Sequence, residues 1–258
     1  MGFALLKGWI AAGRFSPIYV VEPAPSAALK SLARKRAIVL HAALPETLPR
    51  LAAVVLAIKP QVLKGADTLL MALGKAGALV LSIAAGVGTP LLRQKVGRGG
   101  PLVRAMPNTP GAIGRGITVL CAGGKLSAAD RALAEALMAA LGETLWLRDE
   151  ALMDAVTAVS GSGPAYVFLL AEVLAAAGRA QGLDAAIAEQ LARATVSGAG
   201  ALIAADARPA PELRKEVTSP GGTTEAALKV LMSPDGLESL MRRAVDAATR
   251  RGKDLGKA

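Results

Sequence analysis

Short apolar runs alternate with helix-compatible segments before residue 110. Each run is four to six residues long and rich in Val, Ile, Leu or Ala, as expected of buried strands. The runs are Ile18–Val21, Ala37–Leu40, Ala53–Ile58, Ala78–Ile83 and Leu102–Met106. Strands that alternate with helices predict a parallel sheet with helices on both faces.

The periodicity changes near residue 150. Ser127-Ala128-Ala129-Asp130 resembles a capping box that opens a helix to about Ala140, and Glu143–Leu147 is expected to be a final strand. From Ala151 onward the period is helical almost throughout. We therefore expect an α/β domain over residues 1–149 and a helical domain over residues 150–258.

The predicted helical domain carries more apolar surface than it can cover by itself. The segment after Ser160-Gly161-Ser162-Gly163-Pro164 is apolar nearly all round, which predicts a helix buried on most faces. Ala192–Ala205 is crowded with Ala, Gly and Ser, which permits close helix approach. A monomer would expose these surfaces, so we expect a homodimer built through the helical domain.

Composition excludes several classes of protein. The 258 residues are 53% apolar and 19% charged, as in soluble globular proteins. Basic residues exceed acids by 30 to 20, but aromatics are only 3% and no dense Lys/Arg run occurs, so we expect no nucleic-acid partner. The single cysteine, Cys121, fits a reducing cytoplasm, and the single histidine, His41, predicts no metal site. Gly77–Leu92 and Tyr166–Ala177 are too short or too interrupted to predict a membrane span.

The stretch Val217–Thr224 has the features of an anion site. Gly221 and Gly222 follow a Ser-Pro pair and permit a tight turn immediately before a predicted helix. The unpaired N–H groups and positive dipole end of a helix start can hold a carboxylate or phosphate. The hydroxyls that can add hydrogen bonds are those of Ser219, Thr223 and Thr224. The other interpretation is an ordinary glycine-rich loop with a threonine N-cap.

The first residues predict a helix already under way, with no strand before it. In a dinucleotide-binding Rossmann fold, a strand and a Gly-x-Gly-x-x-Gly turn precede such a helix. Glu22 follows the run Ile18–Val21, about twenty residues after Gly2, where that fold places the group that meets the adenosine ribose. An acid at this place repels a 2′-phosphate and favours NADH. A surface-loop acid is the other interpretation of Glu22.

Three segments follow predicted strands at the edge where Rossmann sheets bind their ligands. They are Lys59, Ile83-Ala84-Ala85 and Asn108. Two of them also have a simpler interpretation. Pro60 can end a strand because proline cannot continue a ladder, and Met106–Pro110 can be a rigid turn.

Ordered motifs along essentially the whole chain resemble the pyrroline-5-carboxylate reductase family. They are Ala57-Ile58-Lys59-Pro60-Gln61, Ser82-Ile83-Ala84-Ala85-Gly86-Val87, Arg104-Ala105-Met106-Pro107-Asn108-Thr109-Pro110, Ser160–Tyr166 and Leu213–Leu228. That family uses NADPH or NADH to reduce 1-pyrroline-5-carboxylate to L-proline, the last step of proline biosynthesis. The resemblance implies a Rossmann-like domain, an all-α dimerisation domain, a small imino-acid substrate and assembly beyond a dimer. It also implies that the helical domain of one subunit closes over the cofactor domain of the other.

The resemblance also implies site residues. The expected cofactor-binding positions are Met1, Gly2, Glu22, Ala57, Ile58, Lys59, Pro60, Ile83, Ala84, Ala85 and Asn108, with Asn108 by the nicotinamide. The expected substrate-binding positions are Ser219, Gly221, Gly222, Thr223 and Thr224, and Ser219 and Thr224 are expected in catalysis, with Thr224 near the imine nitrogen. Met1-Gly2 resembles the last two residues of the glycine fingerprint, so we expect about ten residues of first strand to be missing.

Two other functions stay open. A related two-domain hydroxy-acid dehydrogenase would need a lysine or histidine acid/base, and neither Ser160–Tyr166 nor Ser219–Thr224 contains one. An imine reductase tolerates this absence, because a protonated imine is already electrophilic. A truncated, inactive relic or binding protein is the other alternative, and the missing first strand favours it.

Overall fold

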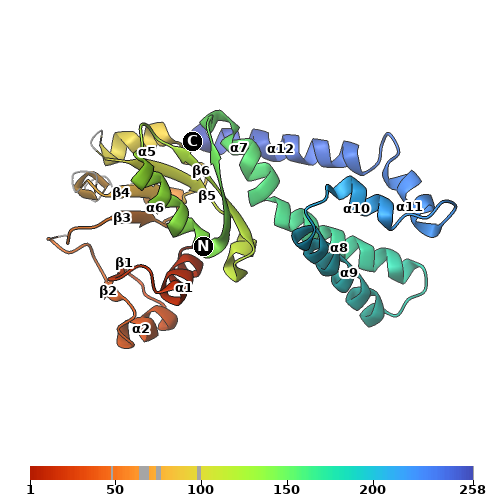
Figure 1. Ribbon diagram of the computed structural model, residues 1–258, viewed down its shortest axis with the longest axis horizontal. Coiled ribbons are helices and arrows are strands. Elements are labelled where there is room, and N and C mark those ends of the chain that lie inside the picture. Colours follow the sequence, from red (N-terminus) through yellow and green to blue (C-terminus); the bar gives the residue numbers. More distant parts are fainter. Residues whose placement is uncertain (48, 64–69, 74–76, 98–99, 258) are drawn as a thin grey trace. The chain divides into compact units, whose positions relative to one another are not determined.

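The computed structural model describes residues 1–47, 49–63, 70–73, 77–97 and 100–257. The chain forms two compact units (Figure 1). Unit 1 comprises Met1–Gly161 and Arg251–Ala258, and unit 2 comprises Ser162–Arg250. Unit 1 is an α/β structure, whereas unit 2 is built of helices.

Unit 1 contains strands and helices in alternation. The strands are β1 (Tyr19–Val21), β2 (Val39–His41), β3 (Ala53–Leu56), β4 (Leu79–Ser82), β5 (Leu102–Met106), β6 (Gly116–Ala122) and β7 (Gly142–Leu147). The helices are α1 (Gly2–Ala12), α2 (Ala27–Arg34), α3 (Pro60–Leu63), α5 (Thr89–Val96), α6 (Ala128–Met138) and α7 (Met153–Val156). The short helical turns are η1 (Thr109–Ile113), η2 (Ala139–Leu141), η3 (Glu150–Leu152) and η4 (Thr157–Gly161).

The strands form two sheets, which are mostly parallel. β1 and β2 pair in parallel, and the second sheet has the order β3-β4-β5-β6-β7. Every neighbouring pair in that second sheet is parallel except β5 and β6. The sequence did not predict β6. Only the tight turn η1, closed by Gly114 at φ 71°, joins it to β5, so the chain reverses without a crossover helix.

Strand β4 shows why the sheet needs helices on both faces. Leu79 and Leu81 are buried in one core cluster, together with residues of α1 and α6. Val80, between them, is buried in another cluster with residues of α3 and α5. A strand that is apolar on both faces is stable only when both faces are covered. The prediction of a Rossmann-like sheet with helices on both faces is confirmed.

The predicted capping box opens α6. Ser127 Oγ accepts a hydrogen bond of 3.1 Å from Asp130 N, and Ser127 N donates to Asp130 Oδ2 at 3.1 Å. These bonds satisfy two backbone donors at the start of the helix. At its other end, Leu137 O accepts from Trp9 Nε1 at 2.7 Å, which fastens α1 to α6.

Unit 2 is a set of helices with little buried surface of its own. They are α8 (Gly163–Ala180), α9 (Ala185–Ala205), α10 (Ala210–Glu216), α11 (Thr223–Leu231) and α12 (Leu237–Lys257), the end of which belongs to unit 1. Gly178 of α8 lies close to the loop before α9, where an added Cβ would be 3.2 Å from Leu183 Cδ1 and 3.5 Å from Ala188 Cβ of α9. In α8 only Ala175 is buried.

The apolar surface of α8 remains open in the single chain. Phe168, Leu169 and Val173 are each at least half exposed. The sequence predicted a helix that is buried on most faces in a dimer and exposed in a monomer, and the single chain shows the exposed state. By length and composition alone, Glu150–Ala180 also resembles a membrane-crossing helix. A surface of this kind needs a cover, either another protein chain or lipid.

Candidate active site

The loop before α11 has a backbone that only glycine adopts easily. Gly221 has φ 72°, in the left-handed region. Gly222 is the N-cap of α11, and an added Cβ there would lie 2.5 Å from Ser219 Oγ and 3.1 Å from Ser219 O. The two glycines are therefore needed to form this turn.

Two backbone donors of the loop are already used inside it. Gly222 N donates to Ser219 O at 3.1 Å, and Gly221 N donates to Glu225 Oε2 at 2.6 Å. Glu225 thus bends back over the loop, and its other oxygen lies 3.4 Å from Lys229 Nζ. The Gly221 amide, which we expected to meet the substrate, is occupied by this carboxylate.

The first amides of α11 remain available. The first i to i−4 bond at this end is from Ala226 N to Gly222 O, at 3.2 Å. Among the residues that the structure describes, the N–H groups of Thr223, Thr224 and Glu225 have no acceptor. Three unpaired donors at the positive end of a helix form a site for an anion.

Hydroxyl groups surround these free amides. Thr224 is half-buried, whereas Ser219 and Thr223 are exposed. No hydroxyl of these three makes a hydrogen bond within the described residues. The N-cap is Gly222 and has no side chain, so the interpretation as a threonine N-cap is wrong. The hydroxyls are therefore free to contact a ligand.

In unit 1, three of the predicted segments lie together at one edge of the sheet. Ala57, Ile58, Lys59 and Pro60 follow β3, and Ile83, Ala84 and Ala85 follow β4. Asn108 comes two residues after β5. Because β3, β4 and β5 are parallel, their carboxyl ends meet at the same edge.

The start of α1 lies against this edge. An added Cβ on Gly2 would be 2.9 Å from Ala57 Cβ, so a larger residue would not fit without movement. The helix has no capping side chain and no acid in its first turn. Asn108 Oδ1 accepts a hydrogen bond from Ile117 N of β6 at 3.0 Å. The side-chain nitrogen of Asn108 therefore points away from β6 and is a free donor within the described residues.

Glu22 belongs to the smaller sheet. It directly follows β1, and its backbone N donates to His41 O at 2.9 Å. One carboxylate oxygen accepts from Ala24 N at 3.0 Å, which fixes the side chain over its own turn. The second oxygen has no partner among the described residues.

A partly buried ion pair supports the loop after β4. Arg104 Nη1, on β5, lies 2.8 Å from Glu150 Oε1, and the exposed fraction of the Arg104 side chain is 8%. The same carboxylate accepts from Thr89 N at 2.8 Å and from the Thr89 hydroxyl. The sequence did not predict this cluster, because the three residues are distant along the chain and each is ordinary alone.

These contacts change the acidity of Glu150. Burial raises the pKa of this carboxyl, but hydrogen bonds from Thr89 and Arg104 outweigh burial and hold the pKa below its usual value. A lowered pKa means that the charged form stabilises the fold. This contribution is complete above the unfolded pKa of about 4.3 and is lost as the pH falls through the lower folded pKa.

We expect Glu150→Gln to lower the free energy of unfolding at pH 7 by about 1 kcal/mol, because a charge-assisted bond becomes neutral. Below about pH 4 the difference from wild type should shrink, since Glu150 is then protonated. Denaturant titrations at fixed protein concentration from pH 7 to pH 3 measure this difference. A difference in the free energy of unfolding that stays constant from pH 7 to pH 3 would contradict the stabilising role of the Glu150 charge.

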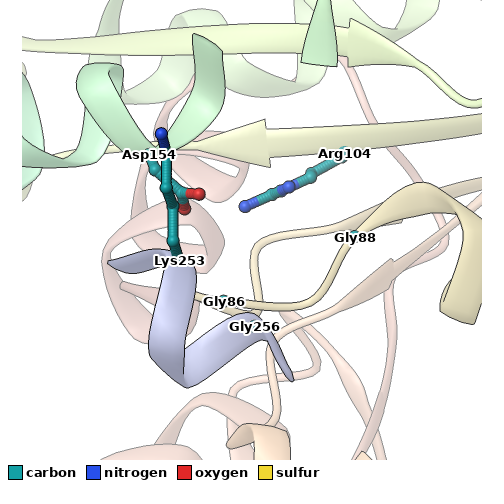
Figure 2. A pocket seen from close by; sticks show the side chains of 6 residues that line it. All are labelled: Gly86, Gly88, Arg104, Asp154, Lys253 and Gly256. Atoms are coloured by element: carbon teal, nitrogen blue, oxygen red, sulfur yellow. The ribbon is translucent and has the colours of Figure 1, made fainter. Parts of the chain in front are cut away.

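A cavity of about 310 Å³ lies beside this ion pair (Figure 2). Its lining residues are Gly86, Gly88, Arg104, Asp154, Lys253 and Gly256. A second cavity, of about 390 Å³, lies between α10 and α11 in unit 2. Three basic residues and one acid line this second cavity: Arg214, Lys215, Lys229 and Glu225. The electrostatic environment of the loop before α11 is therefore positive.

Comparisons with known proteins cover both units. Residues 1–86 match the model of the family NADP oxidoreductase coenzyme F420-dependent, and residues 150–255 match pyrroline-5-carboxylate reductase dimerisation. A pyrroline-5-carboxylate reductase of Pseudomonas aeruginosa is 44% identical over 203 residues, covering 78% of this chain and 74% of the relative.

Two solved structures are similar over nearly the whole chain. A pyrroline-5-carboxylate reductase from Coxiella burnetii superposes with a TM-score of 0.87 at 35% identity, covering 100% of this chain and 95% of that one. The Plasmodium falciparum pyrroline carboxylate reductase with NADP bound gives a TM-score of 0.76 at 27% identity, covering 99% of this chain and 96% of that one.

Proposed function

The chain belongs to the pyrroline-5-carboxylate reductase family, and we propose that the start of α11 holds the carboxylate of its cyclic imine substrate. The family activity is the NAD(P)H-dependent reduction of 1-pyrroline-5-carboxylate to L-proline. The observation that carries the proposal is the set of three free amides at residues 223–225, beside three unpaired hydroxyls.

Each group in this loop has a distinct role in the proposal. The amides of Thr223 and Thr224 donate to the carboxylate, and the Ser219 hydroxyl adds a neutral hydrogen bond. The Thr224 hydroxyl, fixed one residue inside the helix, accepts a hydrogen bond from the protonated ring nitrogen. Holding the ring at two points places its imine carbon in one orientation, which is the main requirement of a transfer reaction.

We expect 1-pyrroline, which lacks the carboxylate, to be reduced with a kcat/KM lower than that of pyrroline-5-carboxylate by on the order of 100-fold or more, since charge-assisted bonds contribute about 1.5–3 kcal/mol each. Steady-state oxidation of NADH or NADPH, followed by absorbance, measures both substrates. Equal kcat/KM for the two would reject the carboxylate anchor. No turnover of either would reject the reductase activity itself.

The edge of the sheet in unit 1 fits a nicotinamide dinucleotide. The uncapped start of α1 offers free amides for a pyrophosphate, and Gly2 removes the side chain that would crowd Ala57. Ile58 and Ile83 provide apolar surface, and the Asn108 amide nitrogen is a donor suited to a carboxamide oxygen. When bound, the reduced nicotinamide supplies the hydride. The protein residues hold the cofactor and exclude water from this edge.

We propose that Glu22 accepts from the adenosine ribose and selects NADH. Replacing it with serine should raise the ratio of kcat/KM for NADPH to that for NADH by at least about fivefold, equivalent to about 1 kcal/mol of removed repulsion. Glu46→Ser, at an exposed loop acid, is the matched control. A Glu22→Ser enzyme with the parental ratio would make Glu22 an ordinary surface acid.

The family match shows a homodimer, and we propose that the open apolar face of α8 forms part of its interface. In the same proposal that face contacts protein rather than lipid, and the enzyme works in the cytoplasm. We place the domain boundary at residues 149 and 150, with residues 150–258 as the substrate-binding and dimerisation domain. Assembly beyond the dimer is part of the proposal. The matched dimerisation family supports only the dimer.

A further inference from the structure

The cavity beside Arg104 has a floor and walls made by four separate segments. Arg104 projects from β5, and the loop Gly86–Gly88 follows β4. Asp154 belongs to α7, and Lys253 and Gly256 come from the end of α12. Figure 2 shows the guanidinium of Arg104 pointing towards the side chains of Asp154 and Lys253.

The end of α12 lies close to its neighbours because small residues permit it. An added Cβ on Gly252 would lie 3.1 Å from Asp154 Oδ1. An added Cβ on Gly256 would lie 3.6 Å from Gly86 O. The wall formed by α12 is therefore seated against both α7 and the loop after β4, and it belongs to the same compact unit as both.

Arg104 is buried but incompletely bonded. A guanidinium has five N–H donors, and within the described residues only Nη1 of Arg104 finds an acceptor, Glu150 Oε1. With 8% of its side chain exposed, Arg104 reaches solvent through the cavity that it lines. Its other nitrogens have no acceptor among the described residues and reach the cavity, so an acceptor that enters the cavity can bond to them.

The other two charges of the cavity are also unpaired. In the part of the chain that the structure describes, neither Asp154 nor Lys253 forms a salt bridge. Arg104 and Glu150 neutralise each other, and Asp154 and Lys253 add one charge of each sign. A phosphate or a dicarboxylate would meet the carboxylate of Asp154, which disfavours ligands of high negative charge.

We propose that this cavity binds a small zwitterion, a free α-amino acid. Its carboxylate accepts from the free nitrogens of Arg104 and from Lys253 Nζ, and its ammonium donates to Asp154. The glycines of the lining leave room for a short side chain. This site is separate from the carboxylate anchor of α11, and it does not depend on the proposed substrate role of that loop.

Calorimetric titration of the full-length protein with L-alanine tests the proposal. We expect saturable binding in the millimolar range, and affinity lower by about tenfold or more for N-acetyl-L-alanine, which lacks the ammonium, and for L-alaninamide, which lacks the carboxylate. Inorganic phosphate serves as the purely anionic probe. Tighter binding of phosphate than of L-alanine would overturn the zwitterion assignment.

Variants locate the site. Asp154→Asn and Lys253→Met should each weaken L-alanine binding by about tenfold or more, whereas Lys125→Met, at an exposed lysine that lines neither cavity, should leave it unchanged. The Asp154→Asn and Lys253→Met variants keep the partly buried Arg104–Glu150 pair intact, so they test the cavity without disturbing the core. Wild-type affinity in both variants, or no binding of L-alanine to the wild type, would reject the site.

Discussion

Replacing Thr224 with alanine is expected to lower kcat by about tenfold to a thousandfold while the affinity for the cofactor stays within about twofold. The reason is the place of this hydroxyl. It is half-buried, has no partner among the described residues, and stands beside the free amides that are proposed to hold the substrate carboxylate. Losing one hydrogen bond at a reacting centre typically costs about 1–4 kcal/mol.

Two controls separate chemistry from stability. Thr224→Ser keeps the hydroxyl and should lose little turnover, whereas Thr223→Ala, one residue earlier and exposed, should lose less than Thr224→Ala. Because Gly222 is the N-cap, the Thr224→Ala melting temperature should be close to that of wild type. Thermal melts and steady-state kinetics measure both effects. An early-melting Thr224→Ala enzyme with normal turnover would make the hydroxyl structural only.

The sequence predicted most strands of the sheet, but it did not predict how the chain connects β5 to the strand beside it. Runs such as Ala78–Ile83 are apolar on both faces, and this local pattern is enough to predict a buried strand. No prediction was made for the segment Gly116–Ala122, which forms β6, and Met106–Pro110 before it was interpreted as a cofactor-site segment or a rigid turn. The reversal depends on Gly114 and on pairing with β5, and such pairing between strands is not visible in local periodicity.

The same limit applies to the sites. The glycines and threonines of residues 219–224 are adjacent in sequence, so a motif predicts an anion site there. Arg104, Glu150 and Thr89 meet only in the folded chain, and nothing in their local sequence predicts a partly buried ion pair. The hydrogen bond from Gly221 N to Glu225 was also missed, although the two residues are close in sequence. The direction in which the Glu225 side chain points depends on where the helix begins, which the motif does not fix.

Gly222→Ala is expected to lower kcat/KM by about tenfold to a hundredfold, through displacement of Ser219. The new methyl group would lie 2.5 Å from Ser219 Oγ, closer than any van der Waals contact permits. Rotation of the serine side chain relieves the clash with Oγ but moves its hydroxyl away from the carboxylate, and the tight contact with Ser219 O remains. The lost bond, together with a shifted first turn of α11, corresponds to about 1–3 kcal/mol. Kinetics with pyrroline-5-carboxylate measure this loss.

A double-mutant cycle shows whether Ser219 transmits the effect. In a Ser219→Ala background the hydroxyl that clashes is gone, so adding Gly222→Ala should reduce kcat/KM by a smaller factor than it does in the wild type. Full additivity of Ser219→Ala and Gly222→Ala would mean that the glycine acts through the backbone of α11 alone. In that case the free amides at the start of α11, and not the serine, would be the groups on which substrate binding depends.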